Sequence, residues 1–167
     1  MKKNQIYSND YQINLNRALR FLSIRPRSEK EIKDYFKVKS QKSKVKIDEK
    51  TIESIINKLK EQKFINDVEF AKWWIDQRTR IKPRSSKLIK YELKQKGISD
   101  EIINNSELKI QNDLEIAKAL AEKRMVRFKN QDPKKIYEKT GRFLASKGFD
   151  YNIIKKSIDE VFSKEYN

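Results

Sequence analysis

The sequence predicts an all-α protein made of three tandem three-helix repeats, about nine helices in an elongated array. Three observations favour this fold class. Apolar residues recur every three or four positions along nearly the whole chain, which is the spacing of one helix face. The 167 residues contain only 3 Gly and 3 Pro, so turn-forming residues are scarce. Hydrophobic residues make up 37% of the chain, which suits helices that each bury one stripe better than a single thick core.

Signals for the start and end of helices recur along the chain and place the repeat boundaries. The Arg-Pro-Arg-Ser stretch at residues 25–28 is echoed by Lys-Pro-Arg-Ser at residues 82–85, and Gly97 is echoed by Gly148. A spacing near 50 residues between matching helix ends is typical of a repeat protein. The predicted organisation is a polar N-terminal tail at residues 1–12 and repeats at residues 13–66, 67–110 and 111–167.

The first repeat begins with a helix whose apolar stripe lies within residues 13–22. Ser28 followed by Glu31 forms a capping-box pattern, which predicts the start of a second helix. Residues 39–47 are rich in Lys and predict a basic loop. Asp48 then caps a third helix. The apolar face of that helix contains Ile52, Ile55, Ile56 and Leu59.

The second repeat begins at Asn66, a residue type that caps helices well. The apolar stripe of its first helix contains Phe70, Ala71, Trp74 and Ile75. Pro83 interrupts the helical pattern, and either Ser85 or Ser86 can cap the second helix. Gly97 suits the left-handed residue that follows that helix, before a short third one.

The third repeat is expected to start near Gln111. Its first apolar stripe contains Leu114, Ala117, Leu120, Ala121 and Met125. Asp132 followed by Pro133 predicts a capped helix with proline in its first turn. Gly148 ends that helix, and Asp150 can cap the last one, whose inward residues are Ile153, Ile154, Ile158, Val161 and Phe162.

The chain is strongly basic, with 40 Lys and Arg against 24 Asp and Glu and a formal net charge of +16. Such a charge attracts polyanions over long distances, and nucleic acid is the common case. An anionic membrane, an acidic protein or a genome rich in Lys codons are the alternatives. The absence of Cys and His excludes disulfides and removes the usual metal ligands and general base. We find no secretory or membrane-spanning stretch and therefore expect a cytoplasmic protein.

Residues 78–96 are the strongest candidate binding segment, because they hold eight cations and one Glu. On a helix, Arg84, Lys87 and Lys94 fall at spacings that place them on one side, with Tyr91 among them. Such a face can neutralise phosphates without reading base sequence, although a solvated face with no partner is the alternative. The predicted contact residues are Arg80, Lys82, Arg84, Lys87, Lys90, Tyr91 and Lys94.

Residues 20–46 form a second basic segment, with ten cations against three carboxylates. Arg25 and Arg27 flank a proline at a helix start, where backbone N–H groups also point outward. We predict that both bind the same polyanion, and the alternative is a turn that Arg keeps soluble. The two tryptophans are base-stacking candidates only weakly: Trp74 is expected in the core and Trp73 at a contact between repeats.

No catalytic residue, metal site or cofactor site is predicted, so we expect a protein that is not an enzyme. The chain has no Gly-rich loop of the kind that holds ATP phosphates. The stretch at residues 132–135 faintly resembles a nuclease motif, but it lacks a second carboxylate at a useful spacing. Glu29 and Glu31 lie on different helix faces, and the helix dipole explains them.

Three ordered blocks resemble the RecX family of regulatory proteins. Residues 18–32 (ALRFLSIRPRSEKEI) resemble the opening signature of that family, residues 59–71 (LKEQKFINDVEFA) its central block, and residues 92–99 (ELKQKGIS) a third block. The resemblance covers roughly residues 15–165 and is weakest in the third repeat. Two departures fall on a turn and a cap: Lys63 stands where the family has Gly, and Asn66 where it has Asp.

The resemblance implies a crescent of three three-helix repeats that binds the RecA recombinase filament and inhibits or modulates it in recombination, DNA repair and the SOS response. It also implies a monomer whose cations contact single- or double-stranded DNA, with no chemistry of its own. Two alternatives stay open from the residues themselves. One is a generic basic DNA-binding protein without a recombinase partner, and the other is a helical-repeat protein adaptor.

Overall fold

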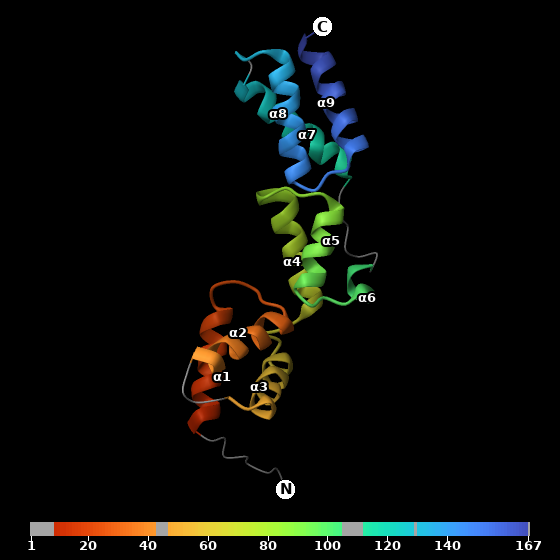
Figure 1. Ribbon diagram of the computed structural model, residues 1–167. Helices are drawn as coiled ribbons and strands as arrows, with labels where there is room; N and C mark the ends of the chain where they lie inside the picture. The colour runs from red at the N-terminus through yellow and green to blue at the C-terminus, as the bar shows by residue number, and fades with distance from the viewer. Residues whose placement is uncertain (1–8, 43–46, 105–111, 129, 167) are drawn as a thin grey trace. The chain divides into compact units, whose positions relative to one another are not determined.

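The structure is a computed structural model that describes residues 9–42, 47–104, 112–128 and 130–166. All regular elements in these ranges are helical, and no strand occurs in them (Figure 1). They are α1 (Asn9–Leu22), α2 (Glu29–Lys42), α3 (Glu49–Glu61), α4 (Asp67–Asp76), the π-helical turn η1 (Gln77–Ile81), α5 (Ser86–Gln95), α6 (Asp100–Ile103), α7 (Asp113–Phe128), α8 (Pro133–Ser146) and α9 (Tyr151–Tyr166). The prediction of an all-α fold with about nine helices is confirmed. No helix within the described ranges has the length and apolar character needed to span a bilayer.

Contacts between Cα atoms divide the chain into two compact units. Unit 1 contains Met1–Trp73 and Gln95–Ile102, and unit 2 contains Trp74–Lys94 and Ile103–Asn167. The division passes through the second predicted repeat, so the start of α4 and the turn after α5 belong to unit 1. The predicted crescent and the predicted repeat boundaries stay predictions.

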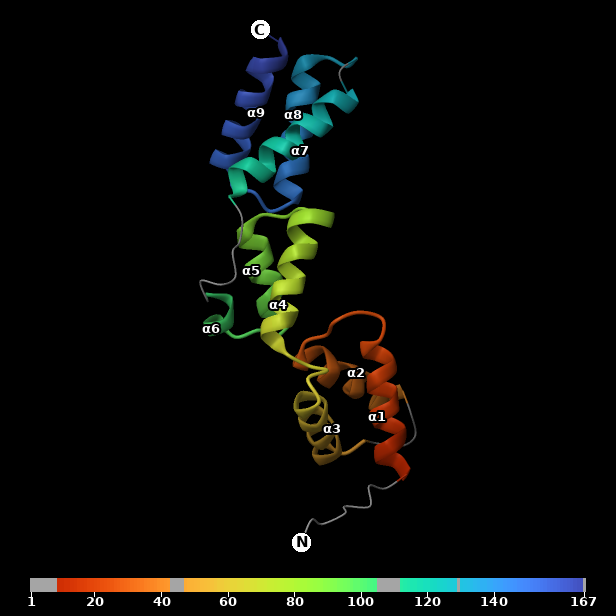
Figure 2. The same cartoon turned by 180° about the vertical axis from the view of Figure 1, so that it is seen from behind.

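The core of unit 1 lies between α1, α2 and α3, which Figure 2 shows grouped together. Its fully buried residues are Ala18, Ile32, Phe36, Ile55 and Leu59. These positions recur every three or four residues within each helix, as the amphipathic pattern predicts. Ile65 closes this core just after α3, at 3% exposure.

Two element boundaries were predicted wrongly in unit 1. Residues 9–12, predicted as part of the polar tail, form the first turn of α1, where Tyr11 is buried at 6% exposure. Residues 39–42, predicted as the start of a loop, form the last turn of α2. Lys and Gln are good helix formers, so α2 continues after its apolar stripe ends. Residues 1–8 and 43–46 lie outside the described residues.

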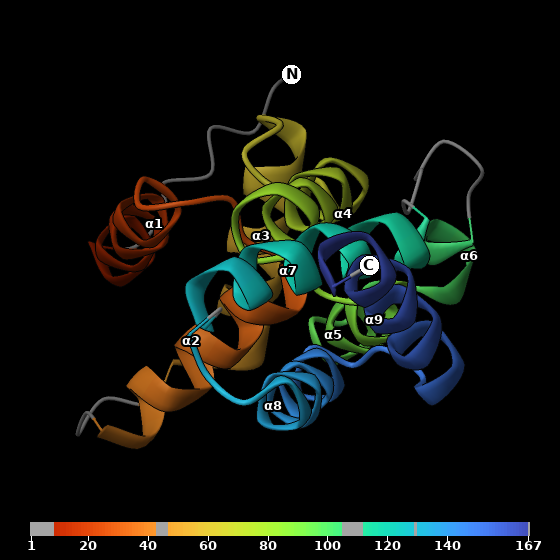
Figure 3. The ribbon, with the colours of Figure 1, turned by 90° about the horizontal axis from the view of Figure 1, so that it is seen from above.

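The core of unit 2 lies between α7, α8 and α9. Its fully buried residues are Ala117, Ala121, Ile136, Leu144 and Ile158. Figure 3 views α8 nearly end-on and shows α7 beside it, seen from its side. Trp74 in α4 is 9% exposed and its indole N–H donates to Glu92 at 2.9 Å, so the prediction that Trp74 is a core residue is confirmed. The predicted start of the third repeat at Gln111 lies outside the described residues.

The helix ends follow the predicted signals closely. The side chains of Asp48 and Asp132 accept hydrogen bonds from backbone N–H groups in the first turns of α3 and α8. Gly97 and Gly148 have φ angles of 79° and 85°, in the left-handed region that favours glycine.

Within the described ranges, Lys63 is the residue other than glycine that has a positive φ angle, 59°. It follows α3 in a Schellman motif, in which Phe64 N–H donates to Leu59 O at 2.8 Å and Lys63 N–H donates to Lys60 O at 2.9 Å. A left-handed conformation costs a non-glycine residue roughly 1–2 kcal/mol. A glycine at this position would therefore avoid the energetic cost of the left-handed conformation.

Replacing Lys63 by Gly is therefore expected to stabilise the protein by about 0.5–1 kcal/mol, after the extra entropy of glycine in the unfolded chain is subtracted. Urea denaturation followed by circular dichroism measures the change. Gln62→Gly is the matched control, since Gln62 has a φ of −82° and gains nothing from glycine. Equal stability changes in the two variants would contradict the assignment of strain to Lys63.

Candidate anion-binding surfaces

The outer face of α5 in unit 2 carries an exposed row of cations with one aromatic residue. The exposed residues are Lys87, Lys90, Tyr91 and Lys94. Ile89 and Leu93 on the opposite side are fully buried, so the helix presents one polar and one apolar face. Lys87 lies 3.3 Å from Asp150, but both side chains are about two-thirds exposed or more, and such pairs contribute little. This α5 face is therefore exposed to solvent and positively charged.

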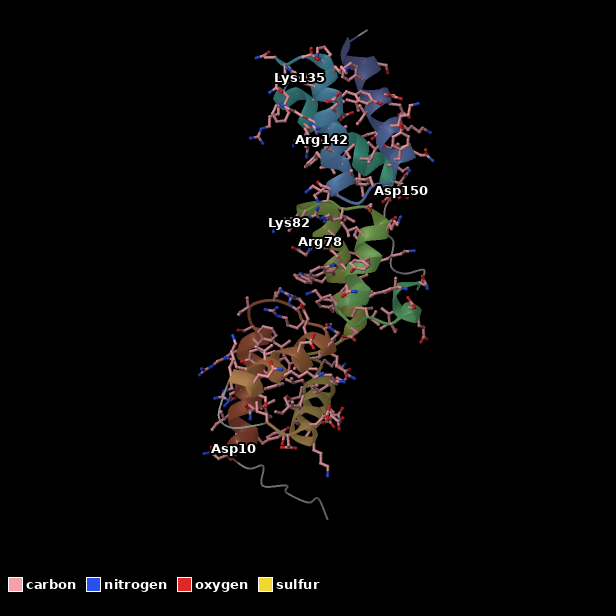
Figure 4. The ribbon with its side chains drawn as sticks, viewed as in Figure 1. Asp10, Arg78, Lys82, Lys135, Arg142 and Asp150 are labelled. Carbon is pink, nitrogen blue, oxygen red and sulfur yellow. The ribbon has the colours of Figure 1, made fainter. Side chains whose placement is uncertain are left out.

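The cations that precede α5 occupy a different position. Arg80 lies in η1, where its guanidinium contacts Asp76 at 2.7 Å while 77% exposed. Arg84 precedes the cap residue of α5, so the prediction that it shares a helical face with Lys87 and Lys94 was wrong. Figure 4 shows Lys82 and Asp150 on opposite sides of unit 2, which separates Lys82 from the α5 face beside Asp150.

Arg25 in unit 1 forms an ion pair with Glu31. Its two terminal nitrogens donate to Glu31 at 3.0 and 2.8 Å, and its guanidinium lies 5.6 Å from the centroid of the Trp73 ring. Lys96 also donates to Glu31, at 2.6 Å. Burial alone raises the pKa of Glu31, but these hydrogen bonds from Arg25 and Lys96 hold that pKa below its usual range. Arg25 thus has a structural role in the folded chain.

This lowered pKa makes Glu31 a source of acid sensitivity. An acid whose pKa is lower in the folded state stabilises fully above its unfolded pKa, near 4.3, and loses that effect as the pH falls through its folded pKa. Glu31→Gln is expected to melt at a lower temperature at pH 7 and to lose less of its melting temperature below about pH 4 than the wild type. Glu61→Gln, at an exposed position of α3, is the control. Parallel pH profiles in wild type and Glu31→Gln would contradict this role.

Arg27 stacks on an aromatic pair and has no carboxylate partner in the described ranges. Its guanidinium lies 3.8 Å from the centroid of the Phe21 ring, and Phe21 stacks on Tyr35 at 4.5 Å. The Nε atom of Arg27 is buried without a hydrogen-bond partner. Burial, and then the charge of Arg25, lower the pKa of Arg27 from its ordinary value. Arg27 remains a cation that an external anion can stabilise.

Arg25 and Arg27 both line an open groove of about 1010 Å³ in unit 1. Most of the other lining residues are apolar, including Leu19, Leu22, Ile24, Phe64 and Trp73. Ile24 is 75% exposed and Phe64 is 54% exposed. The groove therefore combines apolar and cationic side chains.

A polar cluster in unit 1, here called junction 1, joins the start of α2 to the turn at residues 96–97. Ser28 Oγ accepts from the N–H of Glu31 at 3.2 Å and donates to the carbonyl of Lys96 at 2.7 Å. Asp67 in α4 accepts from the N–H of Glu29 at 2.9 Å. The capping-box prediction is half correct, because Ser28 caps α2 while the carboxylate of Glu31 binds Arg25 and Lys96.

Unit 2 contains an equivalent cluster, junction 2, between the start of α5 and the end of α8. Ser85 Oγ accepts from the N–H of Leu88 at 3.2 Å and donates to the carbonyl of Gly148 at 2.6 Å. Asp113 in α7 accepts from the N–H of Ser86 at 2.8 Å. Ser85 is thus the cap of α5, and the same polar device occurs twice in the chain.

Comparison with known proteins identifies the family to which these repeated junctions belong. Models of the first, second and third three-helix domains of RecX match residues 15–39, 66–106 and 111–158. The regulatory protein RecX of Clostridioides difficile is 37% identical over 150 residues, which cover 89% of this chain and 68% of that protein. The chain belongs to the RecX family. The resemblance drawn from its three sequence blocks is confirmed, as is the fold of three-helix repeats.

Other RecX proteins agree with this assignment. The regulatory protein RecX of Bacillus pumilus is 33% identical over 147 residues, which span 87% of this chain and 54% of that protein. A crystal structure of RecX from Lactobacillus salivarius has a TM-score of 0.68 and 32% identity, and covers 93% of this chain and 98% of that one. A second crystal structure, of a regulatory protein RecX, has a TM-score of 0.69 at 25% identity, covering 95% and 80%.

Two cations of this RecX chain that were not among the predicted site residues lie at junction 2. Arg124 in α7 stands 4.4 Å from the centroid of the Phe143 ring, and the Nζ atom of Lys147 stands 5.1 Å from the same centroid. Both lie outside the two basic segments at residues 20–46 and 78–96. One signal was available, since Lys147 precedes Gly148 as Lys96 precedes Gly97.

Proposed function

We propose that this RecX-family chain binds a RecA–DNA filament and inhibits or modulates the recombinase. The observation that supports this most strongly is the α5 face, where three exposed lysines surround Tyr91 in a chain of net charge +16. Phosphates are the anions that such a row meets at regular spacing along a nucleic acid. Contacts to phosphate carry no base information, so binding is independent of sequence.

The mechanism is occupancy. The cations are drawn to the DNA phosphates and to acidic side chains of the filament, and the seated protein then blocks growth, turnover or access of other proteins. Recombination, DNA repair and the SOS response are the processes that such a modulator affects. The chain acts as a monomer in the cytoplasm, without catalytic residues, metal or cofactor.

A RecA ATPase assay on single-stranded DNA, with and without this protein, tests the proposal. Inhibition that weakens as salt rises from low to physiological concentration is the expected result. Equal affinity for free DNA and for the filament would instead indicate a generic DNA-binding protein. An effect on the recombinase that does not change with salt concentration and persists without DNA would indicate a protein adaptor.

A further inference from the structure

The two junctions differ at one position that decides their charge. In junction 1 the third residue after the capping serine is Glu31, which accepts hydrogen bonds from Arg25 and Lys96. In junction 2 the third residue after Ser85 is Leu88, which cannot accept a hydrogen bond. Glu31 therefore neutralises Arg25 and Lys96 in junction 1, and junction 2 has no carboxylate at the equivalent place.

Lys147 of junction 2 lies near Arg84 and shares an aromatic ring with Arg124. Arg84 donates to the carbonyl of Ser146 at 3.3 Å, and burial followed by the charges of Arg84 and Arg78 lowers the pKa of Lys147. Arg124 shares the Phe143 ring with Lys147. Arg78 differs from the other three, because Glu92 neutralises it at 2.6 Å.

Two buried nitrogen atoms in this cluster lack hydrogen-bond partners. The Nε atoms of Arg84 and Arg124 are inaccessible to solvent, and neither bonds to any residue in the described ranges. Neither arginine, nor Lys147, forms an ion pair with a described carboxylate. Grouped cations without an anion repel one another, so a bound oxyanion would relieve the repulsion.

We propose that Arg84, Arg124 and Lys147 form a binding site for a phosphate of a nucleic-acid backbone, in the place that the Glu31 carboxylate takes in junction 1. Guanidinium groups donate through paired N–H groups that match the non-bridging oxygens of a phosphate. Arg124 and Lys147 each lie over the Phe143 ring, whose negative face attracts cations. This site deepens the function proposed above, since it names the ligand and the residues that hold it.

A nucleic-acid backbone fits this surface better than a single acidic side chain. In junction 1 one carboxylate holds Arg25 and Lys96 and leaves Arg27 without a described carboxylate partner, whereas in junction 2 no described carboxylate pairs with Arg84, Arg124 or Lys147. Figure 4 shows Arg78, Lys82 and Arg142 on the same side of unit 2, and the last two are exposed. Further phosphates of one strand can therefore find cations beside the first.

The decisive variant introduces into junction 2 the carboxylate that junction 1 already has. Leu88→Glu is expected to lower the affinity of the full chain for a fluorescent oligothymidylate on the order of tenfold at 0.1 M salt, with a reduced slope of log affinity against log salt. Leu88→Gln has the same size without the charge and is expected to bind as the wild type does. Equal losses in both variants would overturn the proposal.

A second pair of variants keeps the test valid if Leu88→Glu does not fold. Lys147→Gln is expected to reduce the salt slope by about 0.7, the loss of one phosphate contact on a single strand. Lys135→Gln removes one exposed charge from the start of α8 and serves as the control, with the slope unchanged. An unchanged slope in Lys147→Gln would overturn the site.

The same variants separate this site from the wider function. If they lose oligonucleotide affinity while the wild type has no effect on the recombinase ATPase, the site stands and the proposed function fails. If they bind oligonucleotide normally but lose affinity for DNA-free RecA, the ligand is an acidic protein segment and the phosphate assignment is wrong.

Discussion

Reversing the three lysines of the α5 face, in the variant Lys87→Glu, Lys90→Glu, Lys94→Glu, is expected to weaken binding to the RecA–DNA filament by roughly 100- to 1,000-fold at 0.1 M salt. Each phosphate contact changes log affinity by about 0.9 per tenfold change in salt on a duplex and by about 0.7 on a single strand. Three contacts therefore account for about two to three decades of affinity per tenfold change in salt. The measurement is fluorescence anisotropy of labelled filaments at several salt concentrations.

The helix itself should survive this change, because the substituted side chains are exposed and the apolar face of α5 is untouched. An unchanged circular dichroism spectrum verifies this. A matched reversal of Lys123, Lys155 and Lys156, which are exposed on α7 and α9, controls for net charge. Equal losses from both triple variants would show that net charge, and not the α5 face, sets affinity.

Gly148→Ala is expected to destabilise the protein by about 2–4 kcal/mol, the largest stability effect of any single substitution considered. Its φ of 85° costs an alanine roughly 1 kcal/mol or more. The added Cβ would also lie 2.8 Å from Leu88 Cβ and 2.8 Å from Ser85 Oγ, and overpacking of this kind typically costs about 1–3 kcal/mol. Thermal and urea denaturation measure the loss.

Gly141→Ala, in the same unit, is expected to stabilise the protein. Gly141 lies inside α8, and a Cβ there would meet its nearest neighbours, on Ile158 and Ile154, at 3.8 and 3.9 Å. Replacing glycine by alanine within a helix stabilises by about 0.5–1 kcal/mol when there is room. A similar loss in both variants would mean that the tight approach at junction 2 is not what makes Gly148 necessary.

The local part of the fold could be predicted from the sequence because its causes lie within a few residues. Asp48 and Asp132 cap helices through bonds to N–H groups three residues later, and Gly97 and Gly148 meet a local need for positive φ. The start of α1 was missed because Tyr11 precedes the clear apolar stripe in a polar stretch, and its burial depends on contacts with other helices.

The candidate site could be predicted only in part, because the decisive contacts join distant residues. Lys87, Lys90 and Lys94 needed only helical spacing to be placed on one face. The contact predicted at Arg25 stays a prediction, and its partner Glu31 also binds Lys96, which is 65 residues away from Glu31 in the chain. Composition cannot distinguish a cation that is neutralised by such a contact from one that is free to bind.

The two aspartates that hold the junctions have a consequence for the order of folding. The N–H of Glu29 in α2 bonds to Asp67, and the N–H of Ser86 in α5 bonds to Asp113. In each case the carboxylate belongs to a helix later in the chain, so this one N–H group has no protein partner until that helix has been synthesised. A chain that stops before α4, or before α7, therefore lacks the carboxylate that completes the start of α2, or of α5.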